Sequence, residues 1–500
     1  MLKKECEQKP SNFTCWNFLS SKDPCNSRLG LKSSSTRDFL RKIVEISNPA
    51  ANFDLLEDEN EEYGENTFYV NDESTLPSGI AVIENLKKFL NFLKFDYHFF
   101  LYDELLINID KIYSEGLEGE PAALSQFCLV MSLGAIYHGS SPLTDEIPGY
   151  LYFKLACHYL PGIEHSFSLV AIQSHILFAW YFLILNKKGL ASVHSSIAIR
   201  KALCIGLHKW DGAIRAVERE HRSRTWWTAF VTDIFCVSIL GTPHTICIDA
   251  IDVALPSNSN LNKSEKSLFF EHNYFALNVR LALITSKVIS EVYKNDFEVA
   301  SGSHLVTHAL ECLHEWKSNL PLENRRSFED IYPIKRRDAS LHLFYNQTVI
   351  LATRPVLLYY FRLFCNESSM IDENLWKDSH IKCCVTAAKS TIKILSYCKA
   401  NKMISTFGFY DSHYIYSAIL VIFVIEMMRY HKQGFYEVLE PLSILQFQSA
   451  SGNLAARSMS RDLHALFQFI SLNKGISGSS YLYDELFDIK NTIKTDMDDF

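Results

Sequence analysis

The sequence predicts an all-α protein: a large multi-helix domain with flexible N- and C-terminal tails. Hydrophobic residues make up 48% of its 500 residues, and Phe (34) and Tyr (24) are abundant. Gly (19) and Pro (14) are scarce, and few chain breakers among many bulky apolar residues favour long buried helices over a turn-rich β-sandwich. Apolar residues recur at helical spacing, and no strand-length alternating run is present.

The two ends of the chain lack the apolar periodicity of its middle. Residues 1–75 contain a serine run and an acidic run over residues 54–65, so we expect a flexible polar and acidic tail there. Residues 471–500 begin with a Gly/Ser spacer and continue with aromatic and acidic residues. This composition fits an acidic-aromatic activation segment, and its alternative is a disordered end.

Residues 76–470 have the pattern of successive helices in one large domain. Apolar residues at helical spacing begin near Ile83 and continue to the end of this range. Prolines such as Pro256, Pro321 and Pro355 are interpreted as breaks between helices.

Two apolar runs raise the question whether the chain crosses a membrane. Residues 169–185 are interrupted by only three polar residues, and residues 415–424 are followed closely by Glu426. Neither run reaches the ~20 apolar residues that a bilayer requires. We therefore expect helices buried in the protein core and no membrane partner. A membrane protein remains an alternative interpretation of the whole chain.

Charge and cysteine usage exclude some classes of protein. The net charge of −8 gives the whole chain no electrostatic footprint for nucleic acid. The thirteen cysteines are an odd number and stand singly in apolar segments, as Cys128, Cys204 and Cys236 do. This usage is typical of buried free thiols in a soluble protein of the cytosol or nucleus.

No catalytic motif stands out. The sequence has no Gly-rich phosphate loop, no His-Glu-x-x-His zinc helix and no Gly-x-Ser-x-Gly elbow. Isolated histidines such as His175 and His413 are interpreted as half-buried imidazoles with satisfied hydrogen bonds. The sequence therefore predicts no enzyme, no catalytic residue and no cofactor-binding or metal-binding residue.

The most informative stretch covers residues 200–256. A first helix is expected to end at Gly206 in a left-handed cap. A second helix, residues 218–240, begins with acidic residues that suit the helix dipole and carries Asp233 in an apolar setting. Because an unpaired buried carboxylate is costly, Asp233 needs a partner, and Arg200 is the candidate.

Three arginines at helical spacing, Arg219, Arg222 and Arg224, give the second helix a basic face. We interpret this face as solvated, with phosphate binding as the alternative. Structural packing is the default role of the whole passage.

Five elements follow one another within residues 198–256: Ala-x-Arg-x-Ala-x-x-x-Gly-Leu-His, Glu-x-Arg-x-Arg-x-Trp-Trp, a single Asp, Gly-x-Pro and Asp-x-x-Leu-Pro. In this order they resemble the regulatory "middle homology" domain of fungal zinc-cluster transcription factors. The signature residues are Arg200, Gly206, Leu207, His208, Glu220, Arg222, Arg224, Trp226, Trp227, Asp233, Gly241, Pro243, Asp252, Leu255 and Pro256.

The resemblance extends over about residues 80–430. Residues 313–321 around a tryptophan, residues 341–355 ending in Arg-Pro, and residues 384–390 are similar to further elements of the family. The chain departs from the family pattern at Ser223, Ile234 and Thr242. These departures weaken the inference of a charged surface role more than they weaken the inference of the family's fold.

The resemblance implies a nuclear regulator of transcription by RNA polymerase II, with residues 76–470 as its regulatory domain. Family members bind DNA through an N-terminal zinc cluster made by six closely spaced cysteines. In this sequence Cys6, Cys15 and Cys25 are separated by eight and nine residues, which does not build that cluster.

We therefore expect no zinc in this chain, either because its gene model begins downstream of the cluster or because it is a natural regulator without one. Promoter DNA would be reached only through a missing module or a partner. The resemblance allows three further partners: the transcription machinery or co-regulators, a small-molecule effector, and a second copy of the chain in a homodimer. The alternative reading is a helical small-molecule-binding protein or enzyme with a pocket among the aromatic helices.

Overall fold

The computed structural model describes residues 33–49, 76–137, 147–243, 246–294, 299–321, 324, 334–366, 378–429 and 436–472. Within these ranges the chain forms seventeen α-helices and no strand, which confirms the predicted all-α fold. The earlier helices are α1 (Thr36–Ser47), α2 (Gly79–Leu93), α3 (Tyr102–Glu115), η2 (Gly116–Glu118), α4 (Pro121–Ile136), α5 (Tyr150–His158), α6 (Leu160–Glu164), α7 (Leu169–Ile184), α8 (Lys188–Cys204), α9 (Ala216–Leu240) and η3 (Ile248–Ala250). The later helices are α10 (Lys263–Lys266), α11 (Asn273–Val292), α12 (Val299–Ser318), α13 (Arg336–Asn366), α14 (Ser379–Ala400), α15 (Phe409–Arg429), α16 (Tyr436–Ala450) and α17 (Leu454–Leu472).

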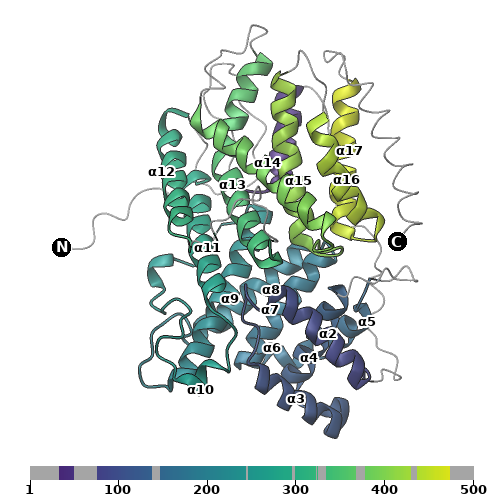
Figure 1. Cartoon of the computed structure of the whole chain (residues 1–500), viewed down its shortest axis with the longest axis vertical. Coiled ribbons are helices and arrows are strands. Elements are labelled where there is room, and N and C mark those ends of the chain that lie inside the picture. Colours follow the sequence, from purple (N-terminus) through teal and green to yellow (C-terminus); the bar gives the residue numbers. More distant parts are fainter. Residues whose placement is uncertain are drawn as a thin grey trace, which may run out of the picture.

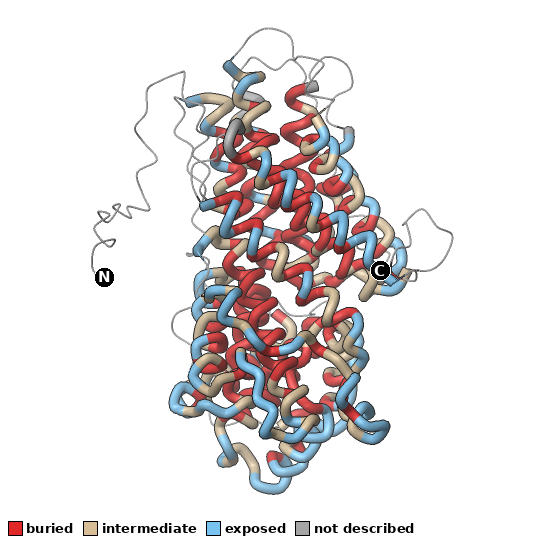
Figure 2. Tube along the Cα trace, turned by 90° about the vertical axis from the view of Figure 1, so that its left-hand side faces the viewer, coloured by how far each residue is buried: buried red, intermediate tan, exposed pale blue. Residues whose placement is uncertain are grey.

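The helices form an elongated bundle with one main hydrophobic core. In Figure 1, α2 to α6 and α10 occupy the lower part of the molecule, α12 to α17 occupy the upper part, and α7 to α9 lie between them. Buried residues run through both parts (Figure 2), and one large cluster of buried apolar side chains joins them. The signature helices α8 and α9 therefore lie at the middle of the core.

The two apolar runs are buried, as predicted. Every residue of α7 from Ala171 to Ile184 is buried, as expected for a helix that is apolar on all sides. By length and composition, α13 and α15 could cross a membrane, and the bent pair α3–α4 would make a third span. However, 94% of the apolar window of α15 and 67% of that of α13 are buried inside the bundle. Packing against neighbouring helices thus accounts for their apolar character.

Helix α1 lies inside the segment that was predicted to be a tail. Its N-cap Ser35 accepts hydrogen bonds from the backbone amides of Arg37 and Asp38, and Phe39, Leu40 and Ile43 are buried. Although α1 comes first in the sequence, it packs against α13, α15 and α17. The tail prediction is therefore wrong for residues 33–49. The rest of residues 1–75, and the acidic-aromatic segment after Leu472, lie outside the described residues.

The cysteine prediction is correct only in part. Cys128 and Cys236 are buried free thiols, whereas Cys204 is exposed at the end of α8. Burial raises the pKa of Cys236 to about 12, so this thiol stays protonated and unreactive at neutral pH.

Pro355 does not break a helix, contrary to the prediction, but lies inside α13. A proline has no N–H, so the carbonyl of Leu351, four residues earlier, loses its helical donor. The hydroxyl of Tyr293, the residue that follows α11, donates to this carbonyl at 2.6 Å. A side chain at the end of a neighbouring helix thus replaces the missing backbone bond, and α13 continues past the proline.

We expect Tyr293→Phe to lower the free energy of unfolding by about 1–3 kcal/mol, because it leaves a buried carbonyl without a donor. In a Pro355→Ala background the same change should cost less, since the amide at position 355 then bonds to Leu351. Urea denaturation of the four proteins of this cycle measures the coupling. Tyr345→Phe is the matched control, because the Tyr345 hydroxyl forms no hydrogen bond within the described part of α13 and its neighbours. Equal losses in both backgrounds would contradict this explanation.

Candidate functional site

The turn after α8 is built by backbone hydrogen bonds around a glycine. Gly206 has a positive φ of 73°, and its amide donates to the Leu203 carbonyl at 3.1 Å. The Leu207 amide donates to the Ala202 carbonyl at 2.9 Å. This pair of bonds is the Schellman motif, which confirms the predicted left-handed cap.

Asp233 is buried on α9, but its predicted partner is wrong. Its Oδ1 accepts hydrogen bonds from the hydroxyls of Ser195 (2.9 Å) and Ser196 (3.4 Å) on α8. Arg200 lies further along α8 and is exposed to solvent. Burial raises the pKa of Asp233, and the two serine bonds oppose that shift. Two small hydroxyls rather than a cation therefore satisfy this carboxyl between the closely packed helices.

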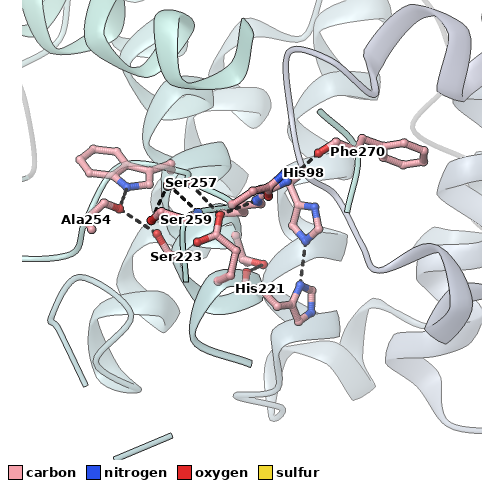
Figure 3. A network of polar contacts seen from close by, with 12 residues as sticks. His98, His221, Ser223, Ala254, Ser257, Ser259 and Phe270 are labelled. Carbon is pink, nitrogen blue, oxygen red and sulfur yellow. Dashed lines mark hydrogen bonds and ion pairs between the residues drawn. The ribbon is translucent and has the colours of Figure 1, made fainter. Parts of the chain in front are cut away.

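Arg224 is also buried, with only 2% of its surface exposed, so the prediction of a solvated basic face is wrong for this residue. Its Nε donates to Glu220 Oε1 at 2.6 Å, one turn earlier on α9. Its two terminal nitrogens donate to Asn258 Oδ1 (2.8 Å) and to the Phe270 carbonyl (3.0 Å). Glu220 Oε1 also accepts the Ser257 amide at 2.9 Å. The ion pair thus ties two segments to α9, one before α10 and one after it (Figure 3).

The Asp-x-x-Leu-Pro segment is held against both signature helices. The amides of Asp252 and Val253 donate to the His208 carbonyl at 2.9 and 3.1 Å. The Ala254 carbonyl accepts hydrogen bonds from the Ser223 hydroxyl (2.9 Å) and the Trp227 indole N–H (2.8 Å), as Figure 3 shows. Ser223, a departure from the family pattern, therefore has a hydrogen bond of its own in this arrangement.

The end of α9 meets the N-terminal segment. Gly241 has a φ of 70°, and a Cβ on it would lie 1.8 Å from Ser33 Oγ. The Ser34 hydroxyl donates to the Ser238 carbonyl on α9 at 3.3 Å. Only glycine fits here, because both the left-handed backbone and the close contact exclude a side chain.

Arg354, from the Arg-Pro element of α13, holds the same N-terminal segment from the other side. It is buried and donates to the Ser34 carbonyl (3.3 Å), to Thr36 Oγ1 (2.9 Å) and to Ser417 Oγ on α15. Its guanidinium also lies over the ring of Phe39 on α1, 4.9 Å from the centroid. Two elements of the family pattern, Gly241 and Arg354, thus meet at the start of α1.

A buried histidine pair lies beside the α9 network and was missed by sequence reasoning. His98 Nε2 and His221 Nδ1 are 2.7 Å apart, and the His98 amide donates to Thr228 Oγ1 at 2.9 Å. Burial lowers the pKa of His221 to about 4 and that of His98 well below its usual range. Both rings are therefore neutral at physiological pH, with one donating to the other. The partners are 123 residues apart, so no local spacing could have revealed them.

His175 and His413 are fully buried, not half-buried as predicted. His175 Nδ1 lies 3.2 Å from His194 Nδ1, and burial lowers the pKa of His175 to about 3. Within the ranges that the structure describes, no three His, Cys, Asp or Glu side chains come together in a way that could hold a metal ion.

A second polar cluster lines a crevice among aromatic side chains between α2, α11, α13 and α15. Asp96 Oδ1 accepts a bond from Asn278 at 3.2 Å, and Arg336 pairs with Asp411 at 2.7 Å. The small-molecule-binding alternative predicts a pocket among the aromatic helices, and this crevice is the candidate for it. The crevice offers about 60 Å³, enough for a few waters at roughly 10–15 Å³ each, and its charged groups already bond to one another.

Burial raises the pKa of Asp96 from 3.8 to about 7. The folded state therefore binds this proton more tightly than the unfolded state does, and the stabilisation present at low pH is lost as pH rises towards 7. We expect Asp96→Asn, which cannot ionise, to gain stability over the wild type by about 2 kcal/mol between pH 5 and 6.5. Denaturation at both pH values measures this gain. Asp110→Asn, at an exposed site on α3, is the control. A difference that does not change with pH would refute the titration of Asp96.

The signature residues are mostly interior. Leu207, Arg224, Trp226, Trp227, Asp233 and Pro256 are buried, whereas Gly206, His208, Glu220, Arg222, Gly241 and Leu255 are half-buried. Arg200, Pro243 and Asp252 are exposed. The structure therefore brings twelve of the fifteen signature residues into the packed region around α8 and α9 and leaves three at the surface.

The packed α8–α9 unit is part of an all-α domain. Residues 85–318 match the family described as "Fungal specific transcription factor domain". Over these residues the chain is similar to a domain that is characteristic of fungal transcription factors. The match includes the whole signature passage, whereas the resemblance drawn over residues 319–430 lies outside the matched residues.

Curated relatives agree with this assignment. An uncharacterized transcriptional regulatory protein of Schizosaccharomyces pombe is 24% identical over 389 residues, 75% of this chain and 48% of the relative. "Activator of stress genes 1" of Saccharomyces cerevisiae is 25% identical over 55% of this chain and 30% of its own length. The "Thiamine repressible genes regulatory protein thi1" of S. pombe is 23% identical over 61% of this chain and 39% of its own length.

The chain thus matches about half or less of the length of these relatives. No solved structure matches it significantly.

Proposed function

We propose that this chain regulates transcription by RNA polymerase II in the nucleus, with residues 76–470 as its regulatory domain. The observation that carries this proposal is the family match over residues 85–318, which contains all the signature residues. The names of the relatives support it, because they are given as transcriptional regulators or activators.

We further propose that the signature residues stabilise the domain and do not contact DNA. Arg224 is buried in an ion pair with Glu220, and Trp227 bonds to the Ala254 carbonyl inside the packed region. A phosphate backbone needs exposed cations, so the burial of Arg224 argues against a DNA-binding face here. Promoter DNA would then be reached through a separate module or a partner. The domain's own contacts would be with the transcription machinery or co-regulators, a second copy of the chain, or a small-molecule effector.

Rapid depletion of the protein in its own cells tests the regulatory role. A degradation tag on the chain, followed by sequencing of nascent transcripts within minutes, should reveal a defined set of genes whose synthesis changes before secondary effects appear. The same tag without the degradation signal is the control. Unchanged nascent transcription after complete depletion would refute the proposal.

A further inference from the structure

A pocket of about 230 Å³ opens beside the turn between α8 and α9. It is lined mainly by residues of the turn after α8 and of the first two turns of α9, among them Lys209, Trp210, Arg219 and Arg222. Small organic molecules need room of this order, since an engineered cavity of about 150 Å³ holds benzene. The pocket is therefore large enough for a small metabolite, unlike the crevice beside Asp96.

The charge of this pocket is opposite to that of the chain. Lys209, Arg219 and Arg222 supply three positive charges, against one negative charge from Asp211, whereas the whole chain carries −8. The Asp211 carboxylate is already used by its own loop, because its Oδ1 accepts the Ala213 amide at 2.9 Å. No acidic side chain within the described residues pairs with the three cations.

The two guanidinium groups are held in place but keep free donors. Arg222 donates one bond, to the Ile205 carbonyl at the end of α8 (2.9 Å). Arg219 donates one bond to the Ile214 carbonyl (3.1 Å) and lies over the ring of Trp210, 4.6 Å from the centroid. A guanidinium has five N–H donors, so most donors of both groups stay available. Their fixed positions lower the entropy lost when a ligand binds.

We propose that this pocket binds a small, multiply charged anion that carries carboxylate or phosphate groups. Two fixed guanidinium groups match the paired oxygens of such groups, and the ammonium of Lys209 adds a third, mobile charge. The concave shape favours a small molecule over the extended backbone of a duplex. Because the pocket joins the end of α8 to the start of α9, a bound anion would stabilise the turn between the signature helices. The inference rests on the proposed function only in naming this anion as the effector.

Calorimetric titration of the full chain at constant ionic strength tests the pocket without any reporter gene. Citrate tests whether the pocket binds carboxylates, and pyrophosphate tests whether it binds phosphates. Glycerol is the uncharged control. We expect saturable binding of at least one anion and none of glycerol. Lys209→Gln and Arg219→Gln should each weaken that binding at least tenfold. Since Lys209 is exposed, its replacement should leave the fold intact.

Arg215→Gln is the matched control. This change removes the same charge from the same loop, but Arg215 is exposed and does not line the pocket. Its binding should equal that of the wild type. An equal loss with Arg215→Gln, no saturable binding of either anion, or displacement of the anion by duplex DNA would each overturn the proposal. The transcription role would survive these outcomes, because nascent transcripts test it separately.

Discussion

Replacing Arg224 with glutamine is expected to lower the free energy of unfolding by about 3–5 kcal/mol, because breaking one side of a buried ion pair leaves the other charge uncompensated. Arg224 is 2% exposed and makes three hydrogen bonds, to Glu220, Asn258 and the Phe270 carbonyl. The shorter glutamine side chain cannot reach all three acceptors. Urea denaturation followed by helical circular dichroism measures the loss.

Two further variants separate the ion pair from a general loss of charge. Arg215→Gln, at an exposed position just before α9, should change stability by no more than about 0.5 kcal/mol. Adding Glu220→Gln to Arg224→Gln removes the stranded carboxylate, so the double variant should lose less than the sum of the two single losses. If Arg224→Gln costs no more than Arg215→Gln, the ion pair does not hold the loop to α9.

Replacing Arg354 with alanine is expected to detach helix α1 from the bundle. The change removes the bonds to the Ser34 carbonyl, Thr36 Oγ1 and Ser417 Oγ and empties the space beneath Phe39. Large-to-small changes in a core cost about 3–5 kcal/mol when the structure does not collapse around them. Because α1 can separate from the bundle, we expect the loss of stability to appear as local unfolding of α1.

Hydrogen exchange measured by mass spectrometry shows where this loss falls. Amides of residues 36–47 should lose their protection, whereas those of α7 should keep theirs. Arg280→Ala, at an exposed position on α11, is the control and should leave α1 protected. Unchanged protection of residues 36–47 in Arg354→Ala would mean that apolar contacts alone hold α1.

Features set by local sequence were predictable. The left-handed cap at Gly206 and the burial of the apolar runs in α7 and α15 follow from glycine's backbone freedom and from the run of apolar side chains. Both signals lie within one segment of the chain. The family pattern likewise identified the passage that the structure places at the middle of the core.

Features set by distant partners were not predictable. Arg200 was a reasonable partner for Asp233 by charge, but the turn of α8 presents Ser195 and Ser196 instead. The pairing of Arg224 with Glu220 was visible as an i, i+4 spacing, whereas the burial of both depends on Asn258 and the loop around it.

The same limit explains the two helix predictions that were wrong. Pro355 was interpreted as a break because the sequence does not show that Tyr293, just after α11, donates to the Leu351 carbonyl. Helix α1 was interpreted as tail because its partners, α13, α15 and α17, follow hundreds of residues later. In both cases tertiary contacts outweighed the local signal.

The claim that this helical domain itself regulates transcription is tested most directly by tethering it to a promoter. Residues 1–500 are fused to a foreign DNA-binding domain, and the output of a reporter gene is compared with that of the DNA-binding domain alone. We predict a clear change in output, which Arg224→Gln reduces and Arg215→Gln leaves intact at matched protein levels. Output equal to that of the DNA-binding domain alone, with the fusion folded and present at the promoter, would contradict the claim.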